Sequence, residues 1–155
     1  MFISPTKGRL SWEELLADII SYVTEAADYP HTVIVGTDSQ VREQTCLVTA
    51  VVVHRQGKGA RYYYQKKYQR KILSLRQRIF YEAALSLELA GRVADYFRES
   101  GFQHLNIEIH LDVGTRGDTK EMIRELVGMV TGSGFDAKIK PDASGASKVA
   151  DKHTK

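Results

Sequence analysis

Two aspartates each follow a short apolar run of the kind that forms a buried strand. Asp38 follows residues 32–37, which are rich in β-branched side chains, and Asp112 follows residues 107–111, where apolar and polar residues alternate. In open α/β sheets, ligands bind beyond the carboxyl ends of the strands, so two acids placed there can share divalent cations. Mg²⁺ and Mn²⁺ suit such a site because they prefer oxygen ligands. Capping of a turn is the alternative role for each aspartate.

A third carboxylate, Glu82, belongs to a long helix predicted over residues 71–100. At about 100° per residue it lies about 60° from Ile79, which belongs to the apolar stripe of that helix. A carboxylate at the edge of a core costs free energy unless another group pairs with it. A metal ion is one such partner, and an ion pair with Arg78, one turn earlier, is the alternative.

The fourth candidate, Asp151, lies in a short helix predicted over residues 144–153, where a solvated surface position is the alternative. Asp142 competes for the same role, although it also suits the cap of a turn or helix. Asp118 is accounted for as the N-cap of a helix predicted over residues 118–132. The residues alone leave open whether Asp151 or Asp142 is the fourth acid.

Three further side chains could support these carboxylates from behind: Arg78, His110 and His153. His110 precedes Asp112 by two residues, so both side chains point to the same face of the predicted strand. A partly buried histidine held by a hydrogen bond is the alternative interpretation for His110. The single cysteine, Cys46, lies in an apolar strand and is interpreted as a packing residue.

Positive charge is concentrated in one part of the chain. Residues 44–81 contain nine basic side chains and no acidic one, although the whole chain has 22 basic and 19 acidic residues. Lysine and arginine release counterions from phosphates, and tyrosine can stack on bases, so this stretch predicts contact with nucleic acid. Tyrosines in a strand also pack well, and half of them must face the core, which is the structural alternative. The candidate nucleic-acid residues are Arg61, Tyr64, Lys66, Lys67, Tyr68, Arg70 and Lys71.

The predicted elements must place these side chains together. A helix over residues 11–28 is followed by three strands over residues 32–38, 47–54 and 61–68, which form an antiparallel meander. The helix at 71–100, a strand at 106–112, the helix at 118–132, a strand at 135–140 and the helix at 144–153 complete the order. Strands separated by helices pair in parallel with right-handed crossovers. We therefore expect an α/β fold with a mixed five-stranded sheet, three antiparallel strands then two parallel, flanked by helices.

Length and composition exclude several classes of protein. A chain of 155 residues, with 43% apolar and 26% charged residues, is expected to form one globular domain over residues 1–155. It has no apolar run of about 18 residues, so we expect no membrane helix. Residues 1–9 lack the apolar centre of a signal peptide, and one cysteine cannot form an internal disulfide or a Cys-based zinc site. A cytoplasmic protein is the resulting expectation.

The order of the elements resembles that of the ribonuclease H-like superfamily. In that superfamily, acids lie on the first strand, on the helix after the meander, at the end of the fourth strand and in the last helix. Asp38, Glu82, Asp112 and Asp151 match those positions one by one. More closely, Gly-Thr-Asp-Ser-Gln at 36–40, Leu-Asp-Val-Gly at 111–114 and Val-Ala-Asp-Lys-His-Thr-Lys at 149–155 resemble the YkuK family of small bacterial proteins. The resemblance covers residues 33–155, and the first helix is additional to that core.

The resemblance implies hydrolysis of phosphodiester bonds in RNA or DNA with two bound Mg²⁺ or Mn²⁺ ions. Asp38 would bridge the ions, while Glu82, Asp112 and Asp151 would complete their ligands. A nucleic-acid-binding module of the same fold with weak or no catalytic activity is the alternative function. A nucleotide phosphotransferase of the actin-like kind would need two such halves, of which this chain supplies one.

Overall fold

The computed structural model describes residues 1–115, 117, 119–143 and 145–154 of the chain. The elements in chain order are β1 (Phe2–Ser4), β2 (Gly8–Leu10), α1 (Trp12–Thr24), β3 (His31–Val41), β4 (Thr45–Arg55), β5 (Ala60–Gln69), α2 (Leu75–Glu99), β6 (Asn106–Gly114), a 3₁₀ turn (Lys120–Met122), α3 (Ile123–Gly132), β7 (Asp136–Lys140) and α4 (Gly145–Thr154). Within α4, the side chains of Ser147, Lys148 and Asp151 are outside the described part.

One mixed sheet carries all of the strands, in the order β2-β1-β5-β4-β3-β6-β7. The meander β3–β4–β5 is antiparallel, β6 pairs in parallel with β3, and β7 pairs in parallel with β6. The five predicted strands are all present, but the predicted count of five is wrong. An N-terminal hairpin, β1–β2, adds two strands at the free edge of β5, where Ile3 pairs with Tyr64.

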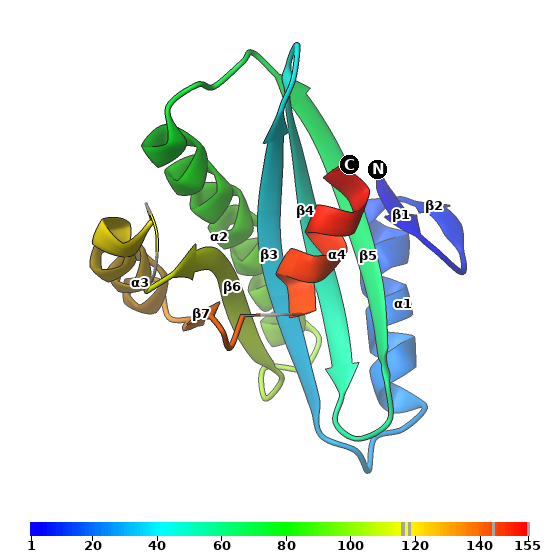
Figure 1. Cartoon of the computed structure of the whole chain (residues 1–155). Coiled ribbons are helices and arrows are strands. Elements are labelled where there is room, and N and C mark those ends of the chain that lie inside the picture. Colours follow the sequence, from blue (N-terminus) through cyan, green and yellow to red (C-terminus); the bar gives the residue numbers. More distant parts are fainter. Residues whose placement is uncertain (116, 118, 144, 155) are drawn as a thin grey trace.

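The helices are divided unequally between the two faces of the sheet (Figure 1). Apolar side chains of α1, α2 and α3 form the main core with the face of the sheet that includes Val33, Val51 and Ile109. On the opposite face, α4 alone contributes to a smaller core, in which its Ala146 and Ala150 pack with residues of β3 and β4. No described helix is long and apolar enough to cross a membrane.

The helix ends follow from local chemistry. Ser11 and Glu14 form the reciprocal hydrogen bonds of a capping box at the start of α1. Ser74 caps α2 by accepting from the backbone N–H of Gln77, so that helix begins later than residue 71, where the sequence predicted it. The predicted helix at 118–132 begins as the 3₁₀ turn and continues as α3, and its expected cap, Asp118, lies outside the described residues.

The strands around the candidate aspartates are longer than predicted, which changes their position. The antiparallel pairing of β3 with β4 continues to Val41 opposite Thr45, so Asp38 lies within β3 and not at its end. The parallel pairing of β3 with β6, in contrast, stops at Gly36 opposite His110. Asp38 and Asp112 therefore each lie two residues beyond the last β3–β6 pair, where these two strands part.

Candidate functional site

Asp38 and Asp112 point to the same face of the sheet. Side chains alternate along a strand, and Leu111 and Val113 belong to the main core, so Asp112 projects to the face that α4 covers. Asp38 projects to that face as well, because its carboxylate accepts a 3.5 Å hydrogen bond from the hydroxyl of Thr154 in α4. Asp38 is buried, whereas the Asp112 side chain is 26% exposed. The two aspartates thus occupy equivalent positions on neighbouring parallel strands, one covered and one open to solvent.

Glu82 approaches the same region from the opposite face. It lies on the buried side of α2, where its residue exposure is 6%, and Oε2 accepts a 2.5 Å hydrogen bond from the hydroxyl of Ser39. Burial raises the pKa of Glu82 to about 8, and the charges of Asp38 and Asp112 raise it as well, against the hydrogen bond from Ser39. Both aspartates are therefore close enough to influence the ionisation of Glu82.

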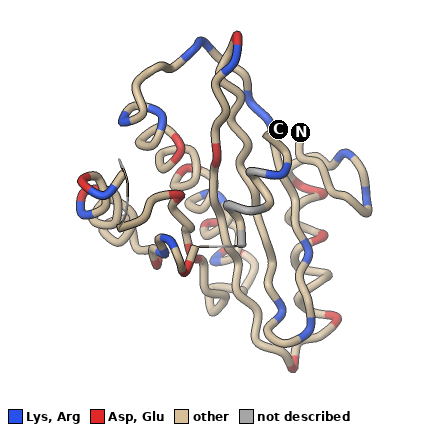
Figure 2. Tube along the Cα trace, in the orientation of Figure 1, with Lys and Arg blue, Asp and Glu red and all other residues tan. Residues whose placement is uncertain are grey.

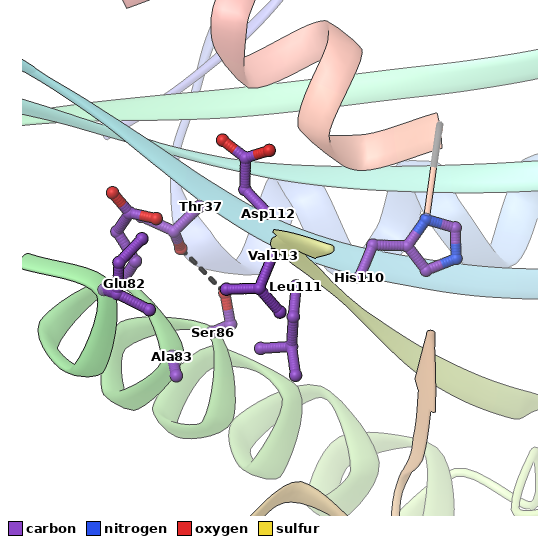
Figure 3. Close-up of a pocket in the computed structure, with 9 residues that line it drawn as sticks. Thr37, Glu82, Ala83, Ser86, His110, Leu111, Asp112 and Val113 are labelled. Carbon is purple, nitrogen blue, oxygen red and sulfur yellow. Dashed lines mark hydrogen bonds between the residues drawn. The ribbon is translucent and has the colours of Figure 1, made fainter. Parts of the chain in front are cut away.

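A small cavity separates α2 from β6 beside these carboxylates (Figure 3). The carboxyl groups of Glu82 and Asp112 lie at the same end of it, in the view of Figure 3. Below them, the hydroxyl of Thr37 forms hydrogen bonds with Ser86 at 2.7 Å and with Thr49 at 3.1 Å. This buried hydroxyl chain ties α2 to β3 and β4, so it fixes the helix that presents Glu82.

The ion pair that offered a structural explanation for Glu82 is not seen. Among the described residues, no salt bridge joins Arg78 to Glu82, and Arg78 only lowers the pKa of Glu82 as the weakest of the effects on it. The Nε atom of Arg78 is itself buried without a hydrogen-bond partner in that part of the chain. Glu82 is thus held by Ser39 and not by a neighbour on its own helix.

The two histidines suggested as supporting groups have other contacts. His110 lies on the same face as Asp112, as predicted, but its Nε2 pairs with Glu108 at 3.1 Å. Burial lowers the pKa of His110, so the imidazole is neutral at physiological pH. His153 stacks on the ring of Tyr64, with the ring centroids 3.8 Å apart, and its Nε2 lies 3.3 Å from the hydroxyl of Tyr62. That these two histidines support the metal-binding carboxylates stays a prediction.

A cationic partner of Asp112 was missed by the sequence reasoning. The Nζ atom of Lys140 lies 2.6 Å from Oδ1 of Asp112. Lys140 is the last residue of β7 and pairs in register with Gly114 of β6. The sequence signal is present but weak: a lysine at the end of the parallel strand next to the one that carries Asp112.

The fourth acid is placed only in part. Asp151 belongs to α4, but its side chain lies outside the described residues. Asp142 is exposed, and its backbone N–H donates to the carbonyl of Ile139 at 2.8 Å, which is the turn position that the sequence suggested as its alternative role. The choice of Asp151 over Asp142 stays a prediction.

The donor set suits a hard divalent cation. Asp38, Glu82 and Asp112 offer only oxygen ligands, and a cation among them would favour the ionised form of Glu82, whose pKa is raised by burial and then by the two aspartates. Within the described part, which lacks the Asp151 side chain, no three acidic, histidine or cysteine side chains lie close enough to hold a metal ion as they stand. A bound ion would therefore draw these carboxylates closer together.

The basic stretch places one lysine and one exposed tyrosine on the face of the aspartates. Asp38 pairs with Val48, and Val48 pairs with Lys66, so Asp38 and Lys66 lie in one cross-strand row, about 10 Å apart at the spacing of strands. In the next row on this face, Tyr68 is 60% exposed. A groove at the end of α4 joins these positions, lined by Gln40, Arg42, Glu43, Gln44, Cys46, Lys66, Tyr68 and Thr154.

The other basic candidates lie elsewhere. Lys67 points to the opposite face, where its Nζ donates to the hydroxyl of Tyr81 at 3.2 Å. Arg61 packs against α1, with an ion pair of 3.3 Å to Asp18 and its guanidinium over the ring of Tyr22. Arg70 and Lys71 are exposed in the connection to α2, where Figure 2 shows basic positions continuing from β5.

Comparison with known proteins shows the family of the chain. The family model described as Ribonuclease H-like matches residues 14–155. The chain belongs to the ribonuclease H-like family. It is also 34% identical over 169 residues to a protein of Bacillus subtilis (strain 168) with the printed name "Uncharacterized protein YkuK", and the match covers 100% of this chain and 97% of that protein. No solved structure matches the chain. The resemblance to a ribonuclease H-like, YkuK-type protein is thereby confirmed.

Proposed function

We propose that this ribonuclease H-like chain is a nuclease that hydrolyses phosphodiester bonds of RNA or DNA with bound Mg²⁺ or Mn²⁺. One observation carries the proposal: Asp38 and Asp112 lie on one face of the sheet where β3 and β6 part, and Glu82 lies near enough on the other face for both aspartates to raise its pKa. Family membership supports the reaction class. Because one fold hosts many functions, the carboxylates and not the fold alone are the basis of the proposal.

Each carboxylate has a distinct part in this proposal. Asp38 and Asp112 present oxygens from the face beneath α4, Glu82 presents its own from α2, and Asp151 completes the set. Divalent cations held by these carboxylates would supply activation of the attacking water and stabilisation of the leaving 3′-oxygen. Bound positive charge would also favour the ionised form of Glu82, against the burial that raises its pKa.

The path of the substrate follows from the face that the aspartates share. Lys66 can contact a phosphate and Tyr68 can stack on a base, both on the face to which Asp38 projects. The groove beyond α4 would then hold the strand that leads into the carboxylates. Stacking tolerates any base, so this path favours a single strand without strong sequence preference.

Cleavage assays test the proposal directly. Single-stranded, duplex and hybrid substrates are incubated with wild type, Asp112→Asn and the control Asp136→Asn, whose carboxylate is exposed on β7. With Mg²⁺ or Mn²⁺, we expect wild type and the control to cut and Asp112→Asn to lose about 10²-fold or more in rate. EDTA should abolish cutting. Equal cutting by all three proteins would identify a contaminant and refute the assignment.

A binding module without chemistry is the second candidate. It is favoured by the ion pair between Lys140 and Asp112, which gives one of the carboxylates a protein cation as its partner. In that case, wild type would bind oligonucleotides with the same Kd in Mg²⁺ and in EDTA and would cut none of them. Cation-dependent cleavage by wild type excludes this candidate.

A further inference from the structure

Asp112 and Lys140 form an ion pair at the candidate site, in which the lysine lies on the side open to solvent. The Lys140 side chain is 57% exposed, whereas that of Asp112 is 26% exposed. An ion pair with its cation largely in water contributes little to stability, so little free energy is needed to open it. In the described part of the chain, no lysine or arginine forms such an ion pair with Glu82. Lys140 is therefore the cation that offsets the charge of the open aspartate.

A glycine makes room for this contact. Gly114 lies opposite Lys140 in the β6–β7 register, and a Cβ atom at residue 114 would lie 3.3 Å from Cβ and 3.9 Å from Cδ of Lys140. The lysine stem thus passes directly over the backbone of β6 to reach Asp112. A side chain at 114 would compete with it for this space.

A groove beside the ion pair offers the ammonium group of Lys140 a second position. This groove is lined by Asp112, Gly114, Thr115, Thr119, Lys140 and Pro141. Among the described residues that line it, the polar side chains are two threonine hydroxyls and a lysine, which suit phosphate oxygens, and the carboxylate of Asp112. The hydroxyl of Thr119 accepts from the backbone N–H of Gly114 at 3.3 Å, which holds the groove against β6.

We propose that Lys140 is an exchangeable counterion: it neutralises Asp112 while the site holds no divalent cation, and cation binding releases it to contact a phosphate of the polynucleotide in the adjoining groove. The inference rests on the proposed function, since it takes Asp112 as a cation ligand. It makes Lys140 a positioning residue that links loading of the site to capture of the substrate.

Calorimetric titration with Mn²⁺ tests the first step. Lys140→Met removes the competing ammonium, so Mn²⁺ should bind about two- to fivefold more tightly than to wild type. Lys140→Arg keeps a cation and should stay near wild type. Lys138→Met is the matched control, since Lys138 is exposed on the same face of β7 and makes the same change in net charge. Equal Mn²⁺ affinity in wild type and Lys140→Met, or an equal gain in Lys138→Met, overturns the inference.

The salt dependence of oligonucleotide binding tests the second step. With Mn²⁺ present, Lys140→Met should reduce the slope of log Kd against log salt by about 0.7, the contribution of one phosphate contact on a single strand. In EDTA the slope should not change, because Lys140 is then held by Asp112. A slope that Lys140→Met leaves unchanged in Mn²⁺ overturns the inference. Kd values are taken from samples in which a gel shows intact oligonucleotide.

These measurements separate two failures. If wild type binds Mn²⁺ and cuts nucleic acid while Lys140→Met behaves like wild type, the counterion role is refuted and the nuclease stands. If neither protein binds Mn²⁺, both the counterion role and the metal-dependent nuclease are refuted.

Discussion

The hydroxyl of Ser39 donates a 2.5 Å hydrogen bond to Oε2 of Glu82 and so joins β3 to the buried side of α2. This bond favours the ionised carboxylate and opposes the burial and the two aspartates that raise the pKa of Glu82 to about 8. Ser39 follows Asp38 directly in the chain. The same strand therefore places the carboxylate of Asp38 on one face of the sheet and, on the other face, the hydroxyl that lowers the pKa of Glu82.

Ser39→Ala should raise the pKa of Glu82 further in the metal-free protein, because the group that stabilises the anion is lost. The Glu82 side-chain carboxyl resonance, followed by ¹³C NMR against pH, measures the change. Ser86→Ala is the control, since Ser86 is also buried on α2 but bonds to Thr37. If Glu82 has the same pKa in Ser39→Ala as in wild type, the role assigned to this hydroxyl is contradicted.

Glu82→Gln should stabilise the metal-free protein, and more so as the pH rises. The pKa of Glu82 is higher in the folded chain than in the unfolded one, so folding binds a proton between about pH 4.5 and 8 and stability falls across that window. Glutamine removes this dependence, with a gain on the order of 3 kcal/mol near pH 7 and little gain near pH 4.5.

Urea unfolding at several pH values gives the free energies, and Glu88→Gln, an exposed position on the same helix, is the control. A gain that is the same at every pH would mean that glutamine acts through packing and not through the ionisation of Glu82.

Sequence periodicity was sufficient to predict the strands and helices that carry the candidate acids. The five strands from β3 to β7 and the four helices were predicted, because each is long enough to show a repeat of apolar residues. The hairpin β1–β2 was missed since its strands have three residues each, too few for alternation. Its place in the sheet depends on the free edge of β5, which lies about 60 residues away in the chain.

In the candidate site as well, the sequence did not predict contacts between segments that are distant in the chain. Asp38, Glu82 and Asp112 could be chosen from residue type and local pattern, and the structure brings these three into electrostatic contact. Ser39 and Lys140 could not be chosen, because their contacts depend on how α2 packs on β3 and on the register between β6 and β7. One of the two tyrosines predicted to contact nucleic acid, Tyr64, has His153 against its ring, a contact between segments 89 residues apart in the chain that the sequence did not indicate.

Gly36→Ala should weaken the docking of α4 over Asp38. A Cβ atom at residue 36 would lie 2.8 Å from Cβ of Ala146 and 3.2 Å from the carbonyl oxygen of His110, so α4 must shift. We expect a loss of about 1–3 kcal/mol in the free energy of unfolding. Gly91→Ala is the matched control, because no atom lies within 4 Å of its Cβ position and alanine favours a helix by up to about 1 kcal/mol.

Hydrogen exchange of the α4 amides locates the effect of Gly36→Ala. Faster exchange confined to α4 and neighbouring strands is expected. Destabilisation by Gly91→Ala that equals that of Gly36→Ala would contradict the steric explanation.

His31 should make the docking of α1 sensitive to acid. Its Nε2 accepts a 3.1 Å hydrogen bond from Nε of Arg55, whose Nη2 donates to the carbonyl of Tyr22 in α1 at 2.6 Å. Burial, and then the charge of Arg55, lower the pKa of His31. The folded chain therefore needs the neutral imidazole: this contribution is complete above about pH 6.5 and is lost as the pH falls toward the lower, folded pKa.

His31→Asn keeps a hydrogen-bond acceptor without a proton to gain. The fall in stability between about pH 7.5 and 5, measured by urea unfolding, should be smaller in His31→Asn than in wild type. His104→Asn, at an exposed position, is the control. An unchanged fall in His31→Asn would show that other groups cause the acid sensitivity.

Lys66 and Lys67 are neighbours in the chain on opposite faces of β5, which allows a sharp test of the nucleic-acid surface. Lys66 lies in the row of Asp38, whereas Lys67 contacts Tyr81 of α2. If the substrate follows the face of the aspartates, Lys66→Ala should reduce the salt slope of single-strand binding by about 0.7 and Lys67→Ala should leave it unchanged. Tyr68→Ala should weaken binding by about 1–3 kcal/mol through lost stacking, with the slope retained. Fluorescence anisotropy at several salt concentrations measures all three, and equal effects of the two lysines would place the nucleic acid elsewhere, because only Lys66 lies on the face of the two aspartates.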